Sequence, residues 1–95
     1  MKGKGTLKVA GGKLVKVEAE FEEGALTKIK IMGDFFLYPE EGLPQLERAL
    51  LGKKAEKGAL ENALRELLEK EKMQLLGLGP GDLADAVLMA AQSAG

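Results

Sequence analysis

The sequence predicts a two-layer α+β domain, in which a three-stranded antiparallel meander is followed by about three helices that cover one face. The prediction rests on two changes of pattern. Apolar and polar residues alternate in three runs near the N-terminus, and from residue 43 onward the apolar spacing becomes that of amphipathic helices. The chain has 95 residues, of which 45% are hydrophobic and 31% charged, so we expect a single folded domain over residues 1–95.

The three alternating runs predict strands at residues 5–10, 13–21 and 25–32. Gly11-Gly12 and Glu22-Glu23-Gly24 separate these runs, and both segments are typical of tight turns. Lysines and glutamates occupy the polar positions of each run, so we expect one face of the sheet to contact water. The inward positions of the middle run are Val15, Val17, Ala19 and Phe21.

Three helices are predicted after these strands. The first has Pro44 in its opening turn and ends before Gly52, which suits the position that follows a helix C-terminus. The second covers residues 55–71. The third has Pro80 in its first turn and Asp82 near its positive N-terminal end. Before the third helix, residues 73–76 form a short apolar run that is either a small strand or a linker.

An aromatic cluster lies where the strand pattern gives way to the helical pattern. Residues 33–39 read G-D-F-F-L-Y-P, although aromatic residues make up only 4% of the chain. The cluster either fills the joint between sheet and helices or contacts a partner, because aromatic side chains are enriched at interface cores. Residues Asp34, Phe35, Phe36, Tyr38 and Pro39 are therefore the candidate partner interface.

The two phenylalanines of this cluster are expected to differ in burial, because consecutive strand residues face opposite ways. Counting from Met32 through an unbroken strand favours Phe36 as the buried one, and leaves the other near the surface with Tyr38. A bulge at Gly33 would reverse that assignment.

The remaining polar motifs have ordinary structural explanations. Asp34 is expected to cap a turn, as Asp often does beside glycine, rather than to act as a lone catalytic carboxylate. Glu40-Glu41 are expected at a helix N-terminus rather than around a cation. The loop Gly77–Asp82 lacks the Lys-Ser/Thr of a phosphate-binding loop, and Pro80 removes one backbone donor.

Composition narrows the possible functions further. The chain has no cysteine and no histidine, so it offers neither thiolate chemistry nor the commonest general base. The net charge is −1, and the lysines near the N-terminus are followed at once by glutamates, so we expect a solvated strand face and no nucleic-acid partner. We expect no membrane span and a cytoplasmic location. Catalytic, cofactor-binding and metal-binding residues are predicted to be absent.

Three segments resemble the C-terminal accessory domain of lipoate–protein ligases, in the form that some lineages encode as a separate small subunit. They are K-V-A-G-G-K-L-V-K-V (Lys8 to Val17), E-E-G-A-L-T-K-I-K-I-M-G-D-F-F-L-Y-P (Glu22 to Pro39) and L-P-Q-L-E-R-A-L-L-G-K (Leu43 to Lys53). The resemblance runs from about Lys8 to the C-terminus and is strongest from Gly12 to Gly52.

This resemblance implies a non-catalytic subunit of a split ATP-dependent ligase. It would pair with the catalytic lipoate–protein ligase subunit as a heterodimer and permit formation of lipoyl-AMP, with lipoate and ATP bound at the catalytic subunit. Lipoyl transfer from preformed lipoyl-AMP would need only the large subunit. The alternative is a cysteine-free scaffold or adaptor that shares the fold of iron–sulfur assembly proteins, although holding a cluster requires thiolates that this chain lacks.

Overall fold

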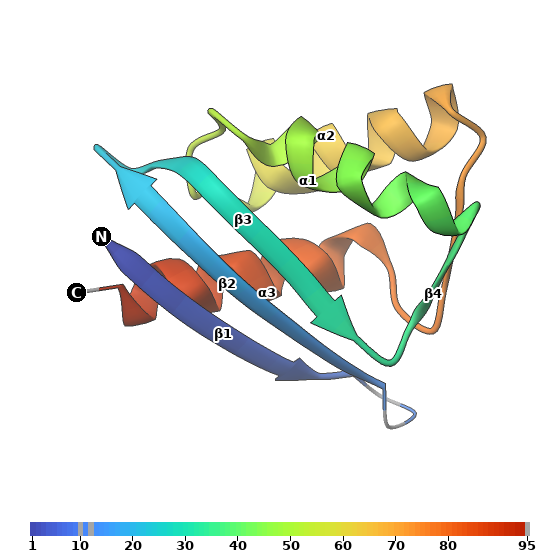
Figure 1. Ribbon diagram of the computed structural model, residues 1–95, viewed down its shortest axis with the longest axis horizontal. Helices are drawn as coiled ribbons and strands as arrows, with labels where there is room; N and C mark the ends of the chain where they lie inside the picture. The colour runs from blue at the N-terminus through green and yellow to red at the C-terminus, as the bar shows by residue number, and fades with distance from the viewer. Residues whose placement is uncertain (10, 12, 95) are drawn as a thin grey trace.

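The protein is an α+β domain in a computed structural model, which describes residues 1–9, 11 and 13–94. Figure 1 shows the three long strands side by side, with the helices packed on one side of them. The elements, in chain order, are β1 (Lys2–Lys8), β2 (Leu14–Glu22), β3 (Ala25–Gly33), β4 (Phe36–Tyr38), the 3₁₀ turn η1 (Glu40–Gly42), α1 (Leu43–Leu50), α2 (Lys57–Lys70), β5 (Gln74–Leu76) and α3 (Pro80–Ser93).

The predicted meander is confirmed as an antiparallel sheet with the order β1-β2-β3. Val17 lies opposite Gly5 on one side and Ile31 on the other, so the three residues share the inner face. A register shift between Glu20 and Phe21 marks a bulge near the second turn. Of the Gly11-Gly12 turn, Gly11 has a φ of 96°, while Gly12 lies outside the described residues, as does Ala10 at the end of the first predicted strand.

The three predicted helices cover the inner face of this sheet. Helix α3 packs on β1 and β2, α1 packs on β3, and α2 lies against both α1 and α3 (Figure 1). Leucines supply most of the large side chains that are fully buried between the layers. These leucines are Leu26, Leu46, Leu50, Leu60, Leu64 and Leu83. Five of them lie on helices, as the helical spacing predicted, whereas Leu26 lies on β3.

Helix α3 and strand β1 approach each other at backbone distance. A Cβ atom built on Gly5 would lie 2.4 Å from the carbonyl oxygen of Ala86, and one on Gly3 would lie 1.8 Å from that of Ala90. Only glycine therefore fits these inward positions of β1. At the end of α3, the Ser93 hydroxyl accepts from the Lys4 N–H at 2.9 Å and donates to the Lys4 carbonyl at 2.8 Å, which closes this part of the edge of β1.

A second, two-stranded sheet joins the aromatic segment to the short apolar run before α3. Within the run at residues 73–76, Gln74–Leu76 form the strand β5, which pairs antiparallel with β4. Each strand has three residues, and this β4–β5 ribbon lies at the end of the molecule where β3 finishes (Figure 1). The sequence suggested a strand here but gave no partner for it.

A candidate partner-docking surface

The aromatic segment is fixed to the main sheet by Asp34. The Asp34 carboxylate accepts a hydrogen bond from the Leu14 N–H at 2.6 Å, and the Asp34 N–H donates to the Leu14 carbonyl at 3.1 Å. Just before it, a Cβ on Gly33 would lie 2.3 Å from the Leu14 carbonyl oxygen, so glycine is needed where the chain turns out of β3. Asp34 was expected to cap its own turn; its carboxylate instead bonds to the start of β2, and the reciprocal bonds hold the joint there.

Side chains alternate in burial along the segment that follows. Phe35 is partly buried and packs against the hydrophobic core, and Leu37 is only 7% exposed. Phe36 is 65% exposed and Tyr38 is 70% exposed. One phenylalanine therefore belongs to the core margin, while the other shares an outer face with the tyrosine, which is the division of roles that the alternation predicted.

The assignment of those roles from the sequence was wrong, because Phe36 is the exposed phenylalanine and Phe35 the one packed inward. Strand β3 ends at Gly33, and a bend at Asp34 separates it from β4, which starts at Phe36. The alternation in fact carries through this bend, because Ile31, Phe35 and Leu37 have the same parity and all pack inward. Phe36 shares the parity of Met32, which is the outward one, so counting from Met32 placed Phe36 on the wrong face.

Strand β5 extends the exposed aromatic surface. Phe36 lies opposite Leu76 and Tyr38 lies opposite Gln74, so these four side chains form one surface, which we call the ribbon face. Leu76 is 52% exposed. Among the described residues, three of the six large apolar side chains that are exposed belong to this face. Clustering of this kind marks interaction surfaces, whereas single exposed apolar residues are ordinary.

A lysine and a short turn border the ribbon face. The Nζ atom of Lys13 lies 5.7 Å from the centroid of the Phe36 ring, within cation–π range. Behind the ribbon, Gly42 of the turn η1 is packed so closely that a Cβ there would lie 2.8 Å from the Met73 sulfur. Glu40 and Glu41 occupy the first turn of η1, which agrees with the N-terminal position expected for them. The face is therefore backed by packed structure.

Other polar groups of the helices make structural contacts. The Asp82 carboxylate accepts from the Gly79 N–H at 2.8 Å and so caps α3 from within. Lys57 of α2 donates to Asp85 of α3 at 2.6 Å, and this hydrogen bond raises the pKa of Lys57. Across the described residues, no group of three or more acidic, His or Cys side chains is placed to hold a metal ion. Likewise, no helix in the described part of the chain is long and apolar enough to cross a membrane.

The comparisons with known proteins identify the family. The sequence model described as the bacterial lipoate protein ligase C-terminus matches residues 5–86. The chain belongs to this family. No curated protein matches the chain. Similar solved structures include a chain from a study of an archaeal lipoylation system, a bi-partite lipoate protein ligase and its E2 lipoyl domain from Thermoplasma acidophilum. The two chains are 26% identical with a TM-score of 0.78, and the similarity covers 92% of this chain and 94% of the other.

These matches confirm that the chain resembles the lipoate protein ligase C-terminal domain, and the structural match extends the similarity to a ligase made of separate parts. The ribbon face brings together Phe36 and Tyr38 from the predicted interface. Phe35 instead packs inward, and the Asp34 carboxylate is hydrogen-bonded to Leu14. Leu76 was missed, although the apolar run at 73–76 was the signal that could have drawn attention to it.

Proposed function

We propose that this lipoate protein ligase domain is the accessory subunit of a split ligase, and that it forms a heterodimer with a catalytic subunit to permit ATP-dependent lipoate adenylation. The observation that carries the proposal is the near full-length similarity, over 92% and 94% of the two chains, to a chain from a study of a bi-partite lipoate protein ligase. The family match over residues 5–86 supports it independently.

In this proposal the reacting groups and the substrates belong to the catalytic subunit. The chain has neither cysteine nor histidine, and Asp34, Asp82 and Asp85 are engaged in structural hydrogen bonds or an ion pair. In the proposal, lipoate and ATP bind at the partner, and this chain acts by docking beside the partner's site. A docked domain can exclude water and complete a site without supplying a nucleophile. The cytoplasmic location expected from the sequence is part of the proposal.

The ribbon face is the surface on which we place the catalytic subunit. Phe36, Tyr38 and Leu76 present apolar area on a paired backbone, so binding needs no further ordering of the backbone there. Burial of such a face supplies a desolvated interface core, and the neighbouring lysine and glutamates form a polar rim. The scaffold alternative, with a fold shared with iron–sulfur assembly proteins, gains no support from the family or structural matches.

Co-purification tests the assembly directly. A catalytic subunit of a split ligase is mixed with this chain at about micromolar concentration, in the range of ordinary protein complexes. We expect a single peak whose mass by light scattering equals one copy of each subunit. Two separate peaks would count against the heterodimer. A shared peak with more than one copy of this chain per partner would contradict the one-to-one assembly.

A further inference from the structure

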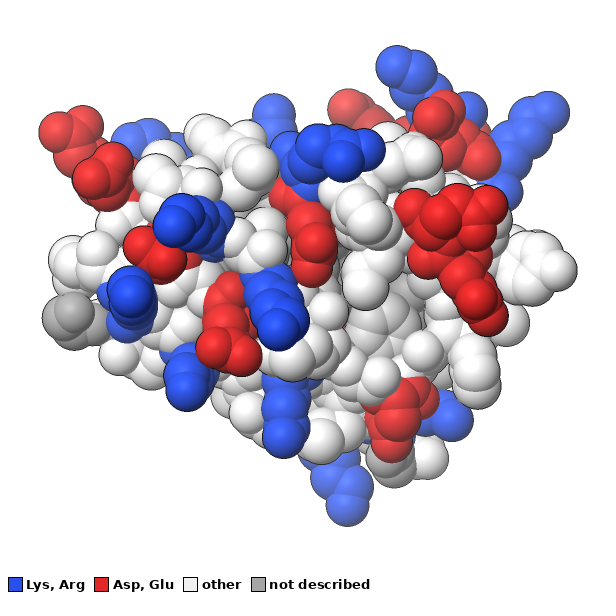
Figure 2. Space-filling view, in the orientation of Figure 1, with Lys and Arg blue, Asp and Glu red and all other residues white. Residues whose placement is uncertain are grey.

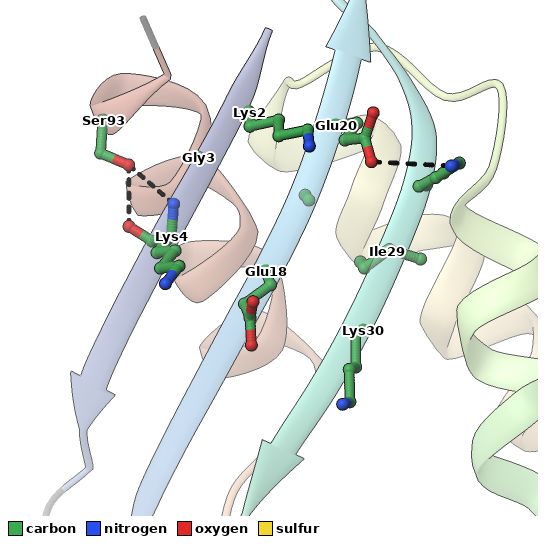
Figure 3. A pocket seen from close by; sticks show the side chains of 10 residues that line it. Lys2, Gly3, Lys4, Glu18, Glu20, Ile29, Lys30 and Ser93 are labelled. Carbon is green, nitrogen blue, oxygen red and sulfur yellow. Dashed lines mark hydrogen bonds and ion pairs between the residues drawn. The ribbon is translucent and has the colours of Figure 1, made fainter.

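The outer face of the three-stranded sheet carries charged side chains in rows. Two rows cross all three strands with the same order of charge: Lys2, Glu20 and Lys28 form one, and Lys4, Glu18 and Lys30 form the next. Figure 3 shows labelled side chains of both rows on the same side of the sheet. Together with neighbouring backbone, these residues line an open groove of about 720 Å³. The groove joins residues that are far apart in the sequence.

Each row keeps an unneutralised positive charge. A glutamate between two lysines can balance only one of them, and among the described residues Lys28 and Glu20, 3.8 Å apart, are the one ion pair in these rows. Over its whole outer face the sheet has six lysines against three glutamates, a balance of +3, although the chain as a whole carries −1. Figure 2 shows the lysines spread over this face. Cross-strand pairing alone would need no such surplus.

This sheet face and the ribbon face have opposite character. An apolar face suits a partner that stays bound, because its burial is favourable only while water is excluded. A charged, solvated face suits a partner that must arrive quickly and leave, because charge steers encounter more than it adds affinity. In a ligase with the proposed function, the catalytic subunit stays, whereas the protein that receives the lipoyl group leaves after each cycle.

We propose that the outer sheet face, centred on the two Lys–Glu–Lys rows, docks an acidic surface of the protein domain that accepts the lipoyl group. This inference rests on the proposed function and names a second partner for it. The contact is made through side chains on the face. Strand addition at the edge of β1 is hindered because Ser93 already occupies both backbone groups of Lys4.

The test measures lipoyl transfer from preformed lipoyl-AMP, so that adenylation does not enter the rate. The probe is an unmodified E2 lipoyl domain with a net negative charge, and the enzyme is the catalytic subunit with or without this chain. We expect the chain to lower the KM for the lipoyl domain. The double substitution Lys4→Glu with Lys30→Glu should raise that KM about tenfold at low salt, and about 0.5 M NaCl should remove the difference.

The matched control carries the same change of charge elsewhere. Lys53 and Lys70 are exposed on the helical side, so Lys53→Glu with Lys70→Glu should leave the KM near that of the unsubstituted chain. The milder double substitution Lys4→Gln with Lys30→Gln should give a smaller rise in KM. It replaces the Lys4→Glu with Lys30→Glu variant in the test if that variant folds poorly.

Three outcomes overturn the inference. They are a KM that does not respond to the Lys4 and Lys30 substitutions, an equal rise with the Lys53 and Lys70 control, and binding of duplex DNA to the same lysines where the lipoyl domain does not bind. Binding of this chain to the catalytic subunit is measured in the same samples. If the unsubstituted chain does not bind the catalytic subunit, the proposed function is contradicted. If it binds but the KM for the lipoyl domain does not respond to the Lys4 and Lys30 substitutions, only this inference is contradicted.

Discussion

Phe36 and Tyr38 are large aromatic side chains that the fold leaves mostly in water, at 65% and 70% exposure. Their positions follow from the backbone: Asp34 clamps the joint to Leu14, the chain bends, and β4 then turns Leu37 inward and its two neighbours outward. Leu76 faces the same way across the ribbon. The three side chains add little to the core, so their effect on function should be separable from their effect on stability.

Removal of the outward aromatic side chains should weaken assembly and spare folding. For Phe36→Ala with Tyr38→Ala, we expect stability to change by within about 0.5 kcal/mol, as surface substitutions do. Affinity for the catalytic subunit should fall about thirtyfold or more, the effect of an interface hot spot of about 2 kcal/mol. Thermal melts and titration calorimetry measure the two quantities. Leu51→Ala, at an exposed leucine away from the ribbon, is the control and should bind normally.

Phe35→Ala should show the reverse pattern. Phe35 packs against the core but is only partly buried, so we expect a loss of about 2 kcal/mol, below the 3–5 kcal/mol typical of a fully buried phenylalanine. Binding measured on the folded fraction should be unchanged. Early melting in both this variant and the Phe36–Tyr38 variant, with normal binding in both, would show that the aromatic segment is only core. The interface would then have to lie on the helices.

At the scale of elements, the fold depends on how closely α3 lies on β1. The sequence K-G-K-G places lysines outward and glycines inward at the start of β1, and the two glycines admit the backbone of α3. The ion pair between Lys57 and Asp85 links α2 to α3 but is exposed to solvent, so it should contribute little. The close strand–helix contact is therefore the element-level feature that substitution should disturb most.

A single methyl group at Gly5 tests that contact. Its Cβ would lie 2.4 Å from the Ala86 carbonyl oxygen, so Gly5→Ala should lower the free energy of unfolding by about 3 kcal/mol, the upper range for overpacking. Gly58→Ala is the control, because nothing lies within 4 Å of a Cβ there and the residue is helical. That change should raise stability by about 0.5 kcal/mol. The two variants are compared by thermal and urea unfolding. Equal melting temperatures and equal urea midpoints for both variants would refute the proposed packing.

The same scale shows what the sequence could predict. Alternation and helical spacing predicted the three long strands and three helices, because their inward residues meet one continuous core. The first strand was expected to start at residue 5, whereas β1 starts at Lys2. The inward residues at this end of β1 are Gly3 and Gly5, and glycine adds no apolar side chain to the alternating pattern. The β4–β5 ribbon could not be predicted for another reason. Each strand has only three residues, too few to show alternation, and the pairing joins positions 36–38 to the distant positions 74–76. The burial of Phe36 was misassigned because the count started from Met32 rather than from Ile31, whose inward parity Phe35 and Leu37 share.

The whole molecule combines two surfaces of different chemistry. The ribbon face is apolar and lies at one end, whereas the outer sheet face carries a balance of +3 that the net charge of −1 conceals. Since only the first can form a dry interface, we assign the lasting subunit contact to the ribbon and the exchanging partner to the sheet. At this scale the central claim is that the chain enables a reaction whose reacting groups it does not supply.

The most direct test of that claim is lipoate-dependent ATP–pyrophosphate exchange. We predict no exchange from this chain alone, little from the catalytic subunit alone, and a rate that rises with added chain until the two are present in equal amounts. The Phe36–Tyr38 double variant should require a higher concentration to reach the same plateau. If the catalytic subunit adenylates lipoate equally well without this chain, the account is contradicted.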